Sequence, residues 1–362
     1  MISRTQEEIT QNWPKEWDTP IVSIRCAAFN HEKYIVNALD GFLKQETNFP
    51  FEVIVHDDAS TDKTVSIIKE YEKKYPNIIK PIYETENQYS KHDGSLRDII
   101  TAACKGKYFA LCEGDDYWTD PNKLQMQIDW LENHPDYTMC CSDATIISPN
   151  GILDWHRYAN DCDIPVKDMI LGGGSFVQTA TLVYRKRLLE DYPELCKKCH
   201  VGDYPLQIWS VLNGKVRYFA KKTAAYNYRR PNSWTSNQTT TSVESLLKGA
   251  RSEFEMLDFL NTYSNGNYSE IFLERKTKIL YNLTRTRPKQ KNFILKQFHD
   301  YEKNFNRLQK LEGILIRLNL WFLIDPYLLL LQKKYKDALY SLPILRVLVP
   351  FIYYNLLGHK KN

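Results

Sequence analysis

The feature that most constrains the fold of this chain is an alternation, from about residue 20, between short apolar runs and stretches with helical spacing. The first pair shows both patterns. "PIVSIRCAAF" (20–29) predicts a buried strand, and "HEKYIVNALDGFLKQ" (31–45) places Ile35, Leu39 and Phe42 on one face of a helix. Repeated β/α units of this kind predict a mostly parallel sheet flanked by helices, as in Rossmann-like α/β folds.

The same alternation continues through the first part of the chain and then becomes less regular. Further strands are expected at 51–58, 78–84 and 107–113, and further helices at 60–75, 95–104 and 120–134. A Gly-rich loop leading into a strand follows at 171–186, then a short helix at 202–215 and a strand-rich segment at 216–234. After about residue 240 the pattern becomes helical.

The composition fits a soluble protein with a large core. The chain has 362 residues, of which 43% are hydrophobic and 25% are charged. Seven basic and three acidic residues between 311 and 362 give an excess equal to the +4 of the whole chain. The first 310 residues are therefore balanced in charge, which argues against a nucleic acid as partner.

The C-terminal segment, 311–362, is both apolar and basic. Arg317, Asp325 and three prolines interrupt it, so it lacks an uncharged run long enough to span a bilayer. Short amphipathic pieces that carry Trp, Tyr and flanking Lys/Arg predict peripheral contact with a membrane surface. A helical cap packed on the main domain is the alternative.

We therefore expect four regions, and a cytoplasmic location with contact to the inner face of the cytoplasmic membrane. The regions are an N-terminal arm (1–19), an α/β domain (20–238), a helical region (239–310) and the apolar, basic segment (311–362). "MISRTQEEITQNWPKEW" has no apolar core of a signal peptide, which predicts reduced thiols. "CKKCH" (196–200) matches a haem-attachment pattern, but a plain pair of thiols is the preferred interpretation.

Polar side chains gather where the predicted strands end. Asp57 and Asp58 end one strand, and "EGDD" places Glu113, Asp115 and Asp116 directly after another. Ligands of open α/β sheets bind beyond the carboxyl ends of the strands. A divalent cation relieves the repulsion within such an acid cluster, and Mg²⁺ or Mn²⁺ favours carboxylate oxygens shared with a diphosphate. A solvated acidic turn before the helix at 120–134 is the alternative.

Three blocks together resemble a known family. "VSIRCAAFNHEKYIVNALDGFLKQ", "VIVHDDASTDKT" and "GKYFALCEGDDYWTDPNKLQMQ" are similar, in order and spacing, to the inverting glycosyltransferase family 2 of GT-A fold. The resemblance covers roughly residues 20–235 and implies that 20–238 is a GT-A catalytic domain. It also implies a nucleotide-sugar donor, with UDP as the expected nucleotide.

The resemblance assigns the donor site to the first two strand ends. The matching positions are Ala28, Phe29, Asn30, Glu32, Asp57 and Asp58. Asp58 matches the acid that accepts a nucleobase N–H, which is a role that a carboxylate can fill. A cap on the following helix is the alternative for Asp58.

The "EGDD" block stands where the family carries its DxD motif. The resemblance implies that Asp115 lies near the ribose and the metal, that Asp116 ligates Mg²⁺ or Mn²⁺, and that Glu113 replaces the usual first Asp. A metal there neutralises the leaving nucleoside diphosphate.

The second half of the chain supplies the remaining candidates. "HVGDYPLQIWSVLNGK" matches the block that holds the catalytic base, so Asp203 is expected to take the proton of the acceptor hydroxyl. Asp191 and Glu194 are rivals, and an N-cap is the structural alternative for Asp203. The late loop "YRRPNSW" offers Arg229 and Arg230 to the diphosphate, with a solvated basic loop as the alternative. The acceptor-side candidates are Gln178, Thr179 and Trp234.

Together these features predict an inverting, metal-assisted glycosyltransferase. Its expected acceptor is a hydroxyl of a glycan or lipid-linked glycan, in cell-surface polysaccharide synthesis. A non-catalytic nucleotide-sugar or glycan-binding module on the same fold is the main alternative. A nucleotidyltransferase would need a Gly-rich basic loop after the first strand, and "AAFNHEKYI" does not supply one.

Overall fold

The computed structural model describes residues 4–91, 93–153, 156–230, 233, 236, 241–287 and 290–298. The chain divides into two units, one of Met1–Ser242 with Arg251–Phe272 and one of Val243–Ala250 with Leu273–Asn362. The predicted membrane segment and Trp234 lie outside the described residues. Within those residues, no helix combines the length and the apolar character that crossing a bilayer requires.

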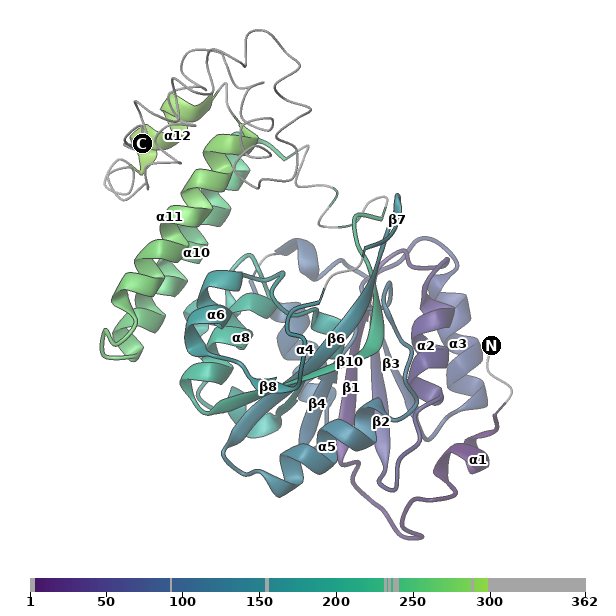
Figure 1. The fold of residues 1–362 in the computed structure, drawn as a ribbon. Helices are drawn as coiled ribbons and strands as arrows, with labels where there is room; N and C mark the ends of the chain where they lie inside the picture. Colours follow the sequence, from purple (N-terminus) through teal and green to yellow (C-terminus); the bar gives the residue numbers. More distant parts are fainter. Residues whose placement is uncertain are drawn as a thin grey trace, which may run out of the picture. The chain divides into compact units, whose positions relative to one another are not determined.

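The first unit contains the predicted parallel sheet (Figure 1). Its strands are β1 (Val22–Ala28), β2 (Phe51–Asp57), β3 (Ile79–Tyr83) and β4 (Tyr108–Leu111), in the order β3-β2-β1-β4. All three neighbouring pairs are parallel. Every residue of β2 is buried, as expected for a central strand of an α/β sheet. The carboxyl ends of β1, β2 and β4 therefore meet at one edge.

The sheet continues into a mixed half. The strand β9 (Val183–Arg185) lies antiparallel between β4 and β6 (Tyr137–Ser148), and β6 pairs in parallel with β10 (Lys215–Asn227). The short β5 (Tyr117–Trp118) pairs antiparallel with β10. Two small strands complete the sheet: β7 (Gly151–Leu153) on β6 and β8 (Cys162–Asp163) on β10. The α/β fold predicted from the sequence is confirmed, with antiparallel strands added.

The sequence analysis missed β6, one of the longest strands. Its run "YTMCCSDATIIS" is mostly small and polar before two isoleucines near its end, although most of it is buried. Pro135 before it and Pro149 after it are the turn signals that mark its ends.

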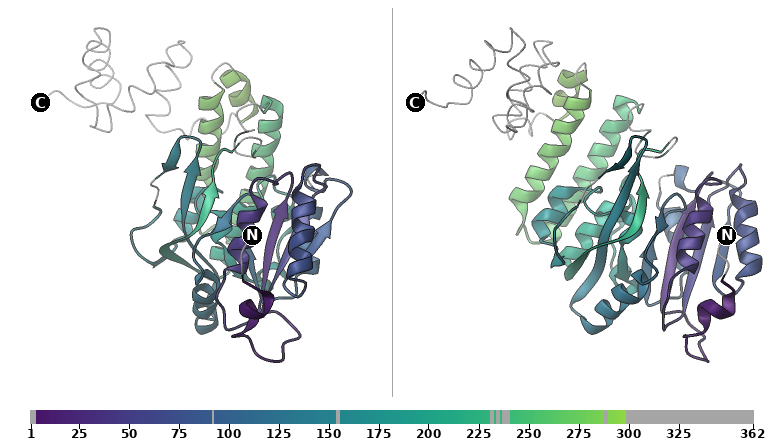
Figure 2. Two further views of the ribbon diagram at one scale, coloured as in Figure 1. Left: turned by 90° about the vertical axis from the view of Figure 1, so that its right-hand side faces the viewer. Right: turned by 45° about the vertical axis from the view of Figure 1, so that its right-hand side comes forward.

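Helices flank the sheet on both sides (Figures 1 and 2). They are α2 (Ile35–Leu43), α3 (Thr64–Lys74), α4 (Ser95–Ala103), α5 (Lys123–Asn133), α6 (Val166–Gly172), α7 (Glu194–Lys197) and α8 (Asp203–Leu212). Both α2 and α3 begin about one turn later than the periodicity predicted. The residues ahead of them form hydrogen-bonded loops at the strand ends, which the next subsection describes.

The N-terminal segment packs into the core of the first unit. The helix α1 (Gln6–Thr10) has a capping box in which Thr5 and Glu8 satisfy each other's backbone N–H. Trp13 is 6% exposed, and its indole N–H donates to Thr47 Oγ1 at 2.9 Å. Residues that the sequence analysis separated as an arm thus stabilise the α/β domain.

The helical extension follows β10. It consists of α10 (Val243–Tyr263), α11 (Ser269–Thr286) and α12 (Lys291–Gln297).

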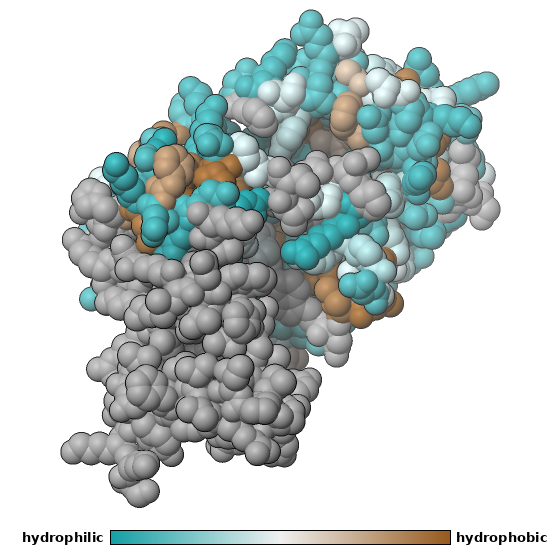
Figure 3. All heavy atoms as spheres, turned by 90° about the horizontal axis from the view of Figure 1, so that it is seen from above, coloured by the Kyte–Doolittle hydropathy of each residue, from teal (hydrophilic) through white to brown (hydrophobic). Residues whose placement is uncertain are grey.

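The described part of the face in Figure 3 is mainly hydrophilic, with hydrophobic residues in small groups. Scattered apolar residues of this kind are normal for a protein surface.

Candidate active site

The loop after β1 is braced against the loop after β2. Asn30 has a positive φ of 53°, a conformation that Asn tolerates better than most residues. Its side-chain oxygen accepts a hydrogen bond from the Thr61 N–H at 2.8 Å, and its own N–H donates to Ser60 Oγ at 2.9 Å. Asn30, predicted to contact the donor, therefore holds the two loops together.

Glu32 has a similar bracing position. Its carboxylate accepts the Lys63 N–H at 3.2 Å, and its N–H donates to Asp62 Oδ2 at 3.1 Å. The other Asp62 oxygen accepts the Thr64 N–H at 2.9 Å at the start of α3. Phe29, which directly precedes Asn30, is 45% exposed.

The two acids at the end of β2 are almost fully buried. Asp58 is 2% exposed, and its oxygens accept the backbone N–H groups of Gln88 at 2.6 Å and Tyr89 at 3.0 Å. These bonds tie Asp58 to the loop after β3. Asp57 is 1% exposed and accepts the Ser60 N–H at 3.0 Å. Its Oδ1 is buried without a hydrogen-bond partner among the described residues.

The acid loop, Glu113–Asp116, lies directly beside the end of β1. The Gly114 N–H donates to the Ala27 carbonyl at 2.8 Å. A Cβ on Gly114 would come within 2.9 Å of His31 Nδ1, so the close approach requires glycine. Asp116 is 4% exposed and accepts the Asn227 N–H at 2.8 Å.

The pairing of β5 with β10 brings a distant arginine to the acid loop. Arg230, just beyond β10, donates from Nε to Asp115 Oδ2 at 2.5 Å. Its Nη2 lies 2.6 Å from His31 Nε2. Burial lowers the pKa of His31 to about 4, so this imidazole is neutral and its Nε2 accepts the guanidinium N–H. Arg230, which was predicted to contact the diphosphate, thus forms an ion pair with Asp115 of the acid loop.

The acid loop concentrates carboxylates whose ionisation is unfavourable. Burial, followed by the charge of Asp115, raises the pKa of Asp116 well above its ordinary value. The same two causes raise the pKa of Glu113 to about 7, and the nearby Arg25 guanidinium opposes them. Carboxyl groups shifted upward by burial and by each other are typical of functional sites.

This acid loop fits a hard cation. Asp115 and Asp116 supply carboxylate oxygens, the ligands that Mg²⁺ and Mn²⁺ favour. No group of three His, Cys, Asp or Glu side chains among the described residues is arranged to hold a metal. Two carboxylates are enough where substrate phosphates complete the coordination.

Asp203 is the first residue of α8, as the sequence predicted. Thr179, one of the acceptor-side candidates, donates its hydroxyl to Asp203 Oδ2 at 2.9 Å. A Cβ on Gly174 would lie 3.2 Å from the other oxygen, so the Gly-rich loop packs directly on this carboxylate. Burial raises the pKa of Asp203, and its charge contributes to the raised pKa of Glu113. Asp203 therefore lies close enough to the acid loop for its charge to act on Glu113.

The remaining candidates from the second half of the chain are Gln178, Arg229 and Glu194. Gln178 precedes the 3-10 turn Thr179–Thr181, and its carbonyl accepts the Thr181 N–H at 2.9 Å. Arg229 has a φ of 54° and lies over the Tyr228 ring, 5.1 Å from its centre. The rival Glu194 forms an exposed ion pair with Lys197 at 2.7 Å.

The sequence analysis missed three residues of the site: His31, Asn227 and Arg25. Arg25 on β1 is 8% exposed and donates to the Tyr184 hydroxyl at 2.6 Å. A charged residue within the apolar run "PIVSIRCAAF" was the available signal. No local pattern marked the other two.

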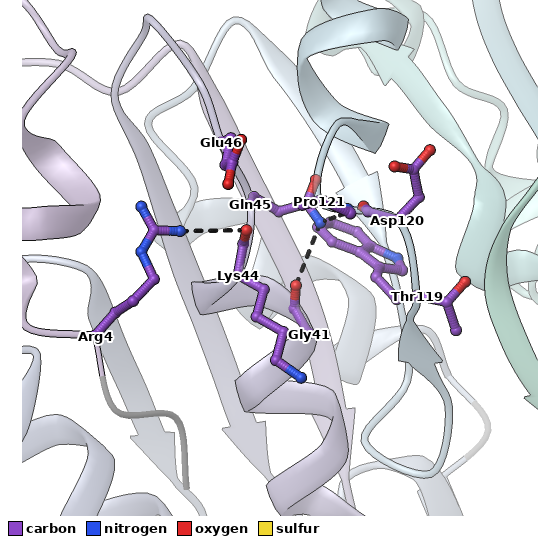
Figure 4. A pocket seen from close by; sticks show the side chains of 9 residues that line it. Arg4, Gly41, Lys44, Gln45, Glu46, Thr119, Asp120 and Pro121 are labelled. Carbon is purple, nitrogen blue, oxygen red and sulfur yellow. Dashed lines mark hydrogen bonds between the residues drawn. The ribbon is translucent and has the colours of Figure 1, made fainter.

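A pocket of about 240 Å³ lies apart from the predicted site residues (Figure 4). Arg4, Gly41, Lys44, Gln45, Glu46, Trp118, Thr119, Asp120 and Pro121 line it. A Cβ on Gly41 would come within 2.9 Å of the Trp118 backbone, so α2 packs tightly there.

Comparisons with known proteins identify relatives of this chain. The chain is 36% identical, over 225 residues, to an uncharacterised protein of Mycobacterium tuberculosis, which covers 60% of this chain and 62% of that protein. It is 26% identical over 281 residues to the Staphylococcus aureus poly(ribitol-phosphate) beta-N-acetylglucosaminyltransferase TarS, covering 70% of this chain and 47% of TarS. The chain thus spans less than two thirds of the length of either relative.

Two solved structures share the fold. TarS 1-349, in complex with UDP-GlcNAc, has a TM-score of 0.50 at 17% identity, over 84% of this chain and 90% of that one. The Pyrobaculum calidifontis mannosyltransferase PcManGT, in complex with GDP-Man and Mn²⁺, has a TM-score of 0.50 at 12% identity, over 86% and 90%. The model of glycosyl transferase family 2 matches residues 23–192, which include the strand ends and the acid loop. Residues 23–192 therefore form a glycosyl transferase family 2 domain.

Proposed function

We propose that this protein is an inverting glycosyltransferase that moves a sugar from a nucleotide-sugar to an acceptor hydroxyl. The observation that carries the proposal is the meeting of two carboxylate groups that lie far apart in sequence. The charge of Asp203, at the start of α8, contributes to the raised pKa of Glu113 in the acid loop after β4. The family 2 domain supports the same reaction class.

Asp203 is the proposed base. The acceptor oxygen forms a bond to the anomeric carbon on the face opposite the diphosphate, and Asp203 takes the hydroxyl proton. The bond between that carbon and the diphosphate oxygen breaks, and its electron pair leaves with the nucleoside diphosphate. Attack from the opposite face inverts the configuration. The raised pKa of Asp203 makes its carboxylate a better proton acceptor than an exposed aspartate.

Asp115 and Asp116 are the proposed holders of Mg²⁺ or Mn²⁺. When bound, such a cation supplies Lewis-acid charge to a leaving diphosphate. Arg230 already contributes positive charge at Asp115, and a phosphate is a second partner that its guanidinium fork can bind. Arg229 is a further candidate for the diphosphate.

The proposed donor is a UDP-sugar, and the nucleobase lies at the ends of β1 and β2. Ala28, Asn30 and Glu32 shape this region through the braced loops. The buried Oδ1 of Asp57 is an acceptor suited to a base-edge N–H. The neighbouring Phe29 ring offers a partly exposed face for stacking. The name of the relative TarS, an N-acetylglucosaminyltransferase, is compatible with a UDP-linked donor.

The proposed acceptor is a glycan or lipid-linked glycan of a cell-surface polysaccharide. Thr179, which donates a hydrogen bond to the base, and its chain neighbour Gln178 are the proposed acceptor contacts. The apolar, basic segment 311–362 motivates the proposal of peripheral attachment at the cytoplasmic membrane face. A chain truncated after residue 310 that still fractionates with membranes would argue against that role.

The test begins with thermal melts against UDP, GDP, CDP and dTDP, each with and without Mn²⁺. A ligand that binds only the folded state raises the melting temperature. We expect a metal-dependent rise with UDP, followed by sugar transfer that Asp203→Asn abolishes. Binding of UDP without transfer to any acceptor would favour a non-catalytic module, and no shift with any nucleotide would overturn the donor site.

A further inference from the structure

Arg97, on α4, was not among the predicted site residues, but it contacts the segment that carries the proposed base. Its Nη2 donates to the Gly202 carbonyl at 3.1 Å, and Gly202 directly precedes Asp203. A Cβ on Gly202 would lie 3.4 Å from the same nitrogen, so the arginine packs against this residue. The contact joins residues 105 positions apart in the chain, so only the tertiary structure brings them together.

The sheet in turn holds Arg97. The side chain of Arg25, on β1, donates from Nη2 to the Arg97 carbonyl at 3.2 Å and from Nη1 to the Tyr184 hydroxyl on β9 at 2.6 Å. The Arg97 guanidinium lies 5.5 Å from the centre of the Tyr192 ring, within cation–π distance. These contacts therefore run from the sheet, through α4, to the residue before Asp203.

The start of α8 has no capping side chain of its own. Gly202 is the N-cap residue and makes no side-chain cap hydrogen bond. A capping side chain normally fixes the first turn of a helix. Here the Arg97 side chain holds the backbone just ahead of Asp203, and the Thr179 hydroxyl holds the Asp203 carboxylate itself.

The charge of Arg97 also acts on this carboxylate. Burial raises the pKa of Asp203, and the Thr179 hydrogen bond and the Arg97 charge oppose that rise. The Asp203 charge in turn contributes to the raised pKa of Glu113 and of Tyr89. Among these groups Arg97 supplies the positive charge, which favours the ionised form that a base requires.

We propose that Arg97 is a positioning residue for the base: by holding the Gly202 carbonyl, its guanidinium places the Asp203 carboxylate for proton transfer from the acceptor hydroxyl. This inference rests on the proposed function, because it takes Asp203 as the base. A misplacement of about 1 Å at a reacting group can lower a rate by about 10²-fold. A contact on the backbone of the adjacent residue is therefore sufficient to matter for turnover.

The first test needs neither donor nor acceptor. Urea unfolding at pH 8 compares the full chain with Arg97→Gln, Asp203→Asn and the double variant. We expect Arg97→Gln to shift the unfolding equilibrium constant about fivefold more in the unmodified chain than in the Asp203→Asn background, because only the former offers Arg97 a carboxylate charge. The difference should shrink toward pH 4, where Asp203 takes up a proton. Additive effects at pH 8 overturn the inference.

The second test measures turnover. The probe is the release of UDP from UDP-GlcNAc, the donor in the TarS structure, with Mn²⁺ and with water in place of the acceptor hydroxyl. Arg97→Gln should lower kcat about tenfold or more and leave the KM for the donor unchanged. Raising the pH should recover part of this loss, because removal of the positive charge raises the pKa of Asp203 further. Arg97→Lys keeps the charge and a donor group, so it should recover most of kcat.

A matched control separates this role from a general loss of structure. Arg187 also donates to one backbone carbonyl, that of Pro135 at 2.9 Å, on the surface. Arg187→Gln should therefore leave kcat and its pH profile unchanged. A raised donor KM with unchanged kcat in Arg97→Gln would place Arg97 in the donor site and overturn the inference.

The nucleotide melts keep this inference separate from the proposed function. A UDP shift that persists in every variant, together with additive unfolding effects, refutes only the role of Arg97. A missing UDP shift and no release of UDP in the unmodified chain refute the proposed function, whichever result the unfolding comparison gives.

Discussion

Two aspartates near strand ends, Asp58 and Asp116, differ in how their charge is satisfied. At the end of β2, both oxygens of Asp58 accept backbone N–H groups of the loop after β3. After β4, Asp116 accepts one backbone N–H, and burial and the neighbouring Asp115 raise its pKa. Asp203 has one hydroxyl partner and also a raised pKa.

The difference separates carboxylates that hold a loop in place from carboxylates that are candidates for a role in the reaction. A carboxylate that accepts several N–H bonds is stabilised in its charged form and holds a loop in place. Carboxylates that are buried and repel each other store unfavourable free energy that a cation, a substrate or a proton relieves. Aspartates near the ends of neighbouring strands can therefore have different roles, one structural and one in binding or catalysis.

The largest expected effect belongs to the base. Asp203→Asn should lower kcat by about 10²–10⁴-fold, because the amide cannot take the acceptor proton. The folded pKa of Asp203 lies above its ordinary 3.8, so its ionisation opposes folding as pH rises above that value. The variant should melt higher than the unmodified protein at pH 7, with the gap closing toward pH 4. Glu194→Gln is the control, and unchanged kcat in Asp203→Asn would exclude Asp203 as base.

The next effect contrasts Asp58 with Asp116 directly. Asp58→Asn should lower the free energy of unfolding by about 2 kcal/mol, because one charged acceptor for a partly buried backbone N–H is lost. Asp116→Asn removes a buried charge, so its stability should be equal or higher, while the Mn²⁺-dependent UDP shift should disappear. Urea unfolding and the nucleotide melt measure the two effects. If Asp58→Asn has the same free energy of unfolding as the unmodified protein, the Asp58 carboxylate does not hold the loop after β3 in place.

A buried lysine at the start of α5, Lys123, should have a smaller effect on stability. Lys123 is fully buried, with Nζ 2.6 Å from Gln127 Oε1 and 4.4 Å from the centre of the Trp118 ring. Burial lowers its pKa from 10.5 to about 8, so the folded state holds its proton poorly and stability falls as pH drops from 10.5 to 8. Lys123→Met should gain about 1–2 kcal/mol at pH 7, allowing for the lost hydrogen bond. Melts from pH 7 to 10 should show the gain shrinking, and a constant gain would refute the charge as its cause.

The smallest effect tests the braced loop after β1. Asn30→Ala should cost about 1 kcal/mol, through lost hydrogen bonds and the positive φ. Asn30→Gly keeps the backbone conformation available and should cost less. If either variant leaves stability unchanged but weakens UDP binding tenfold, then Asn30 contacts the donor and the brace is secondary.

Local patterns in the sequence were sufficient for most of the fold. Continuous apolar runs predicted β1, β2, β3 and β4, because strands buried on both faces have little room for polar residues. The helices of this half followed from their apolar spacing. The prediction was weaker for β6, whose small and polar residues resemble a loop although tertiary contacts bury them. It was also less accurate at helix starts, where loop hydrogen bonds compete with the first turn.

The sequence by itself determined which acids stand at strand ends, and the matched motifs indicated the family, since both depend on residues close together in the chain. Only the tertiary structure decided which acids are satisfied by backbone N–H groups and which are left to repel each other. That outcome depends on the pairing of β5 with β10, which brings Arg230 and Asn227 to the acid loop, and on the Gly-rich loop that packs on Asp203. Partners that are distant in the chain leave no local pattern, because burial and charge act through space.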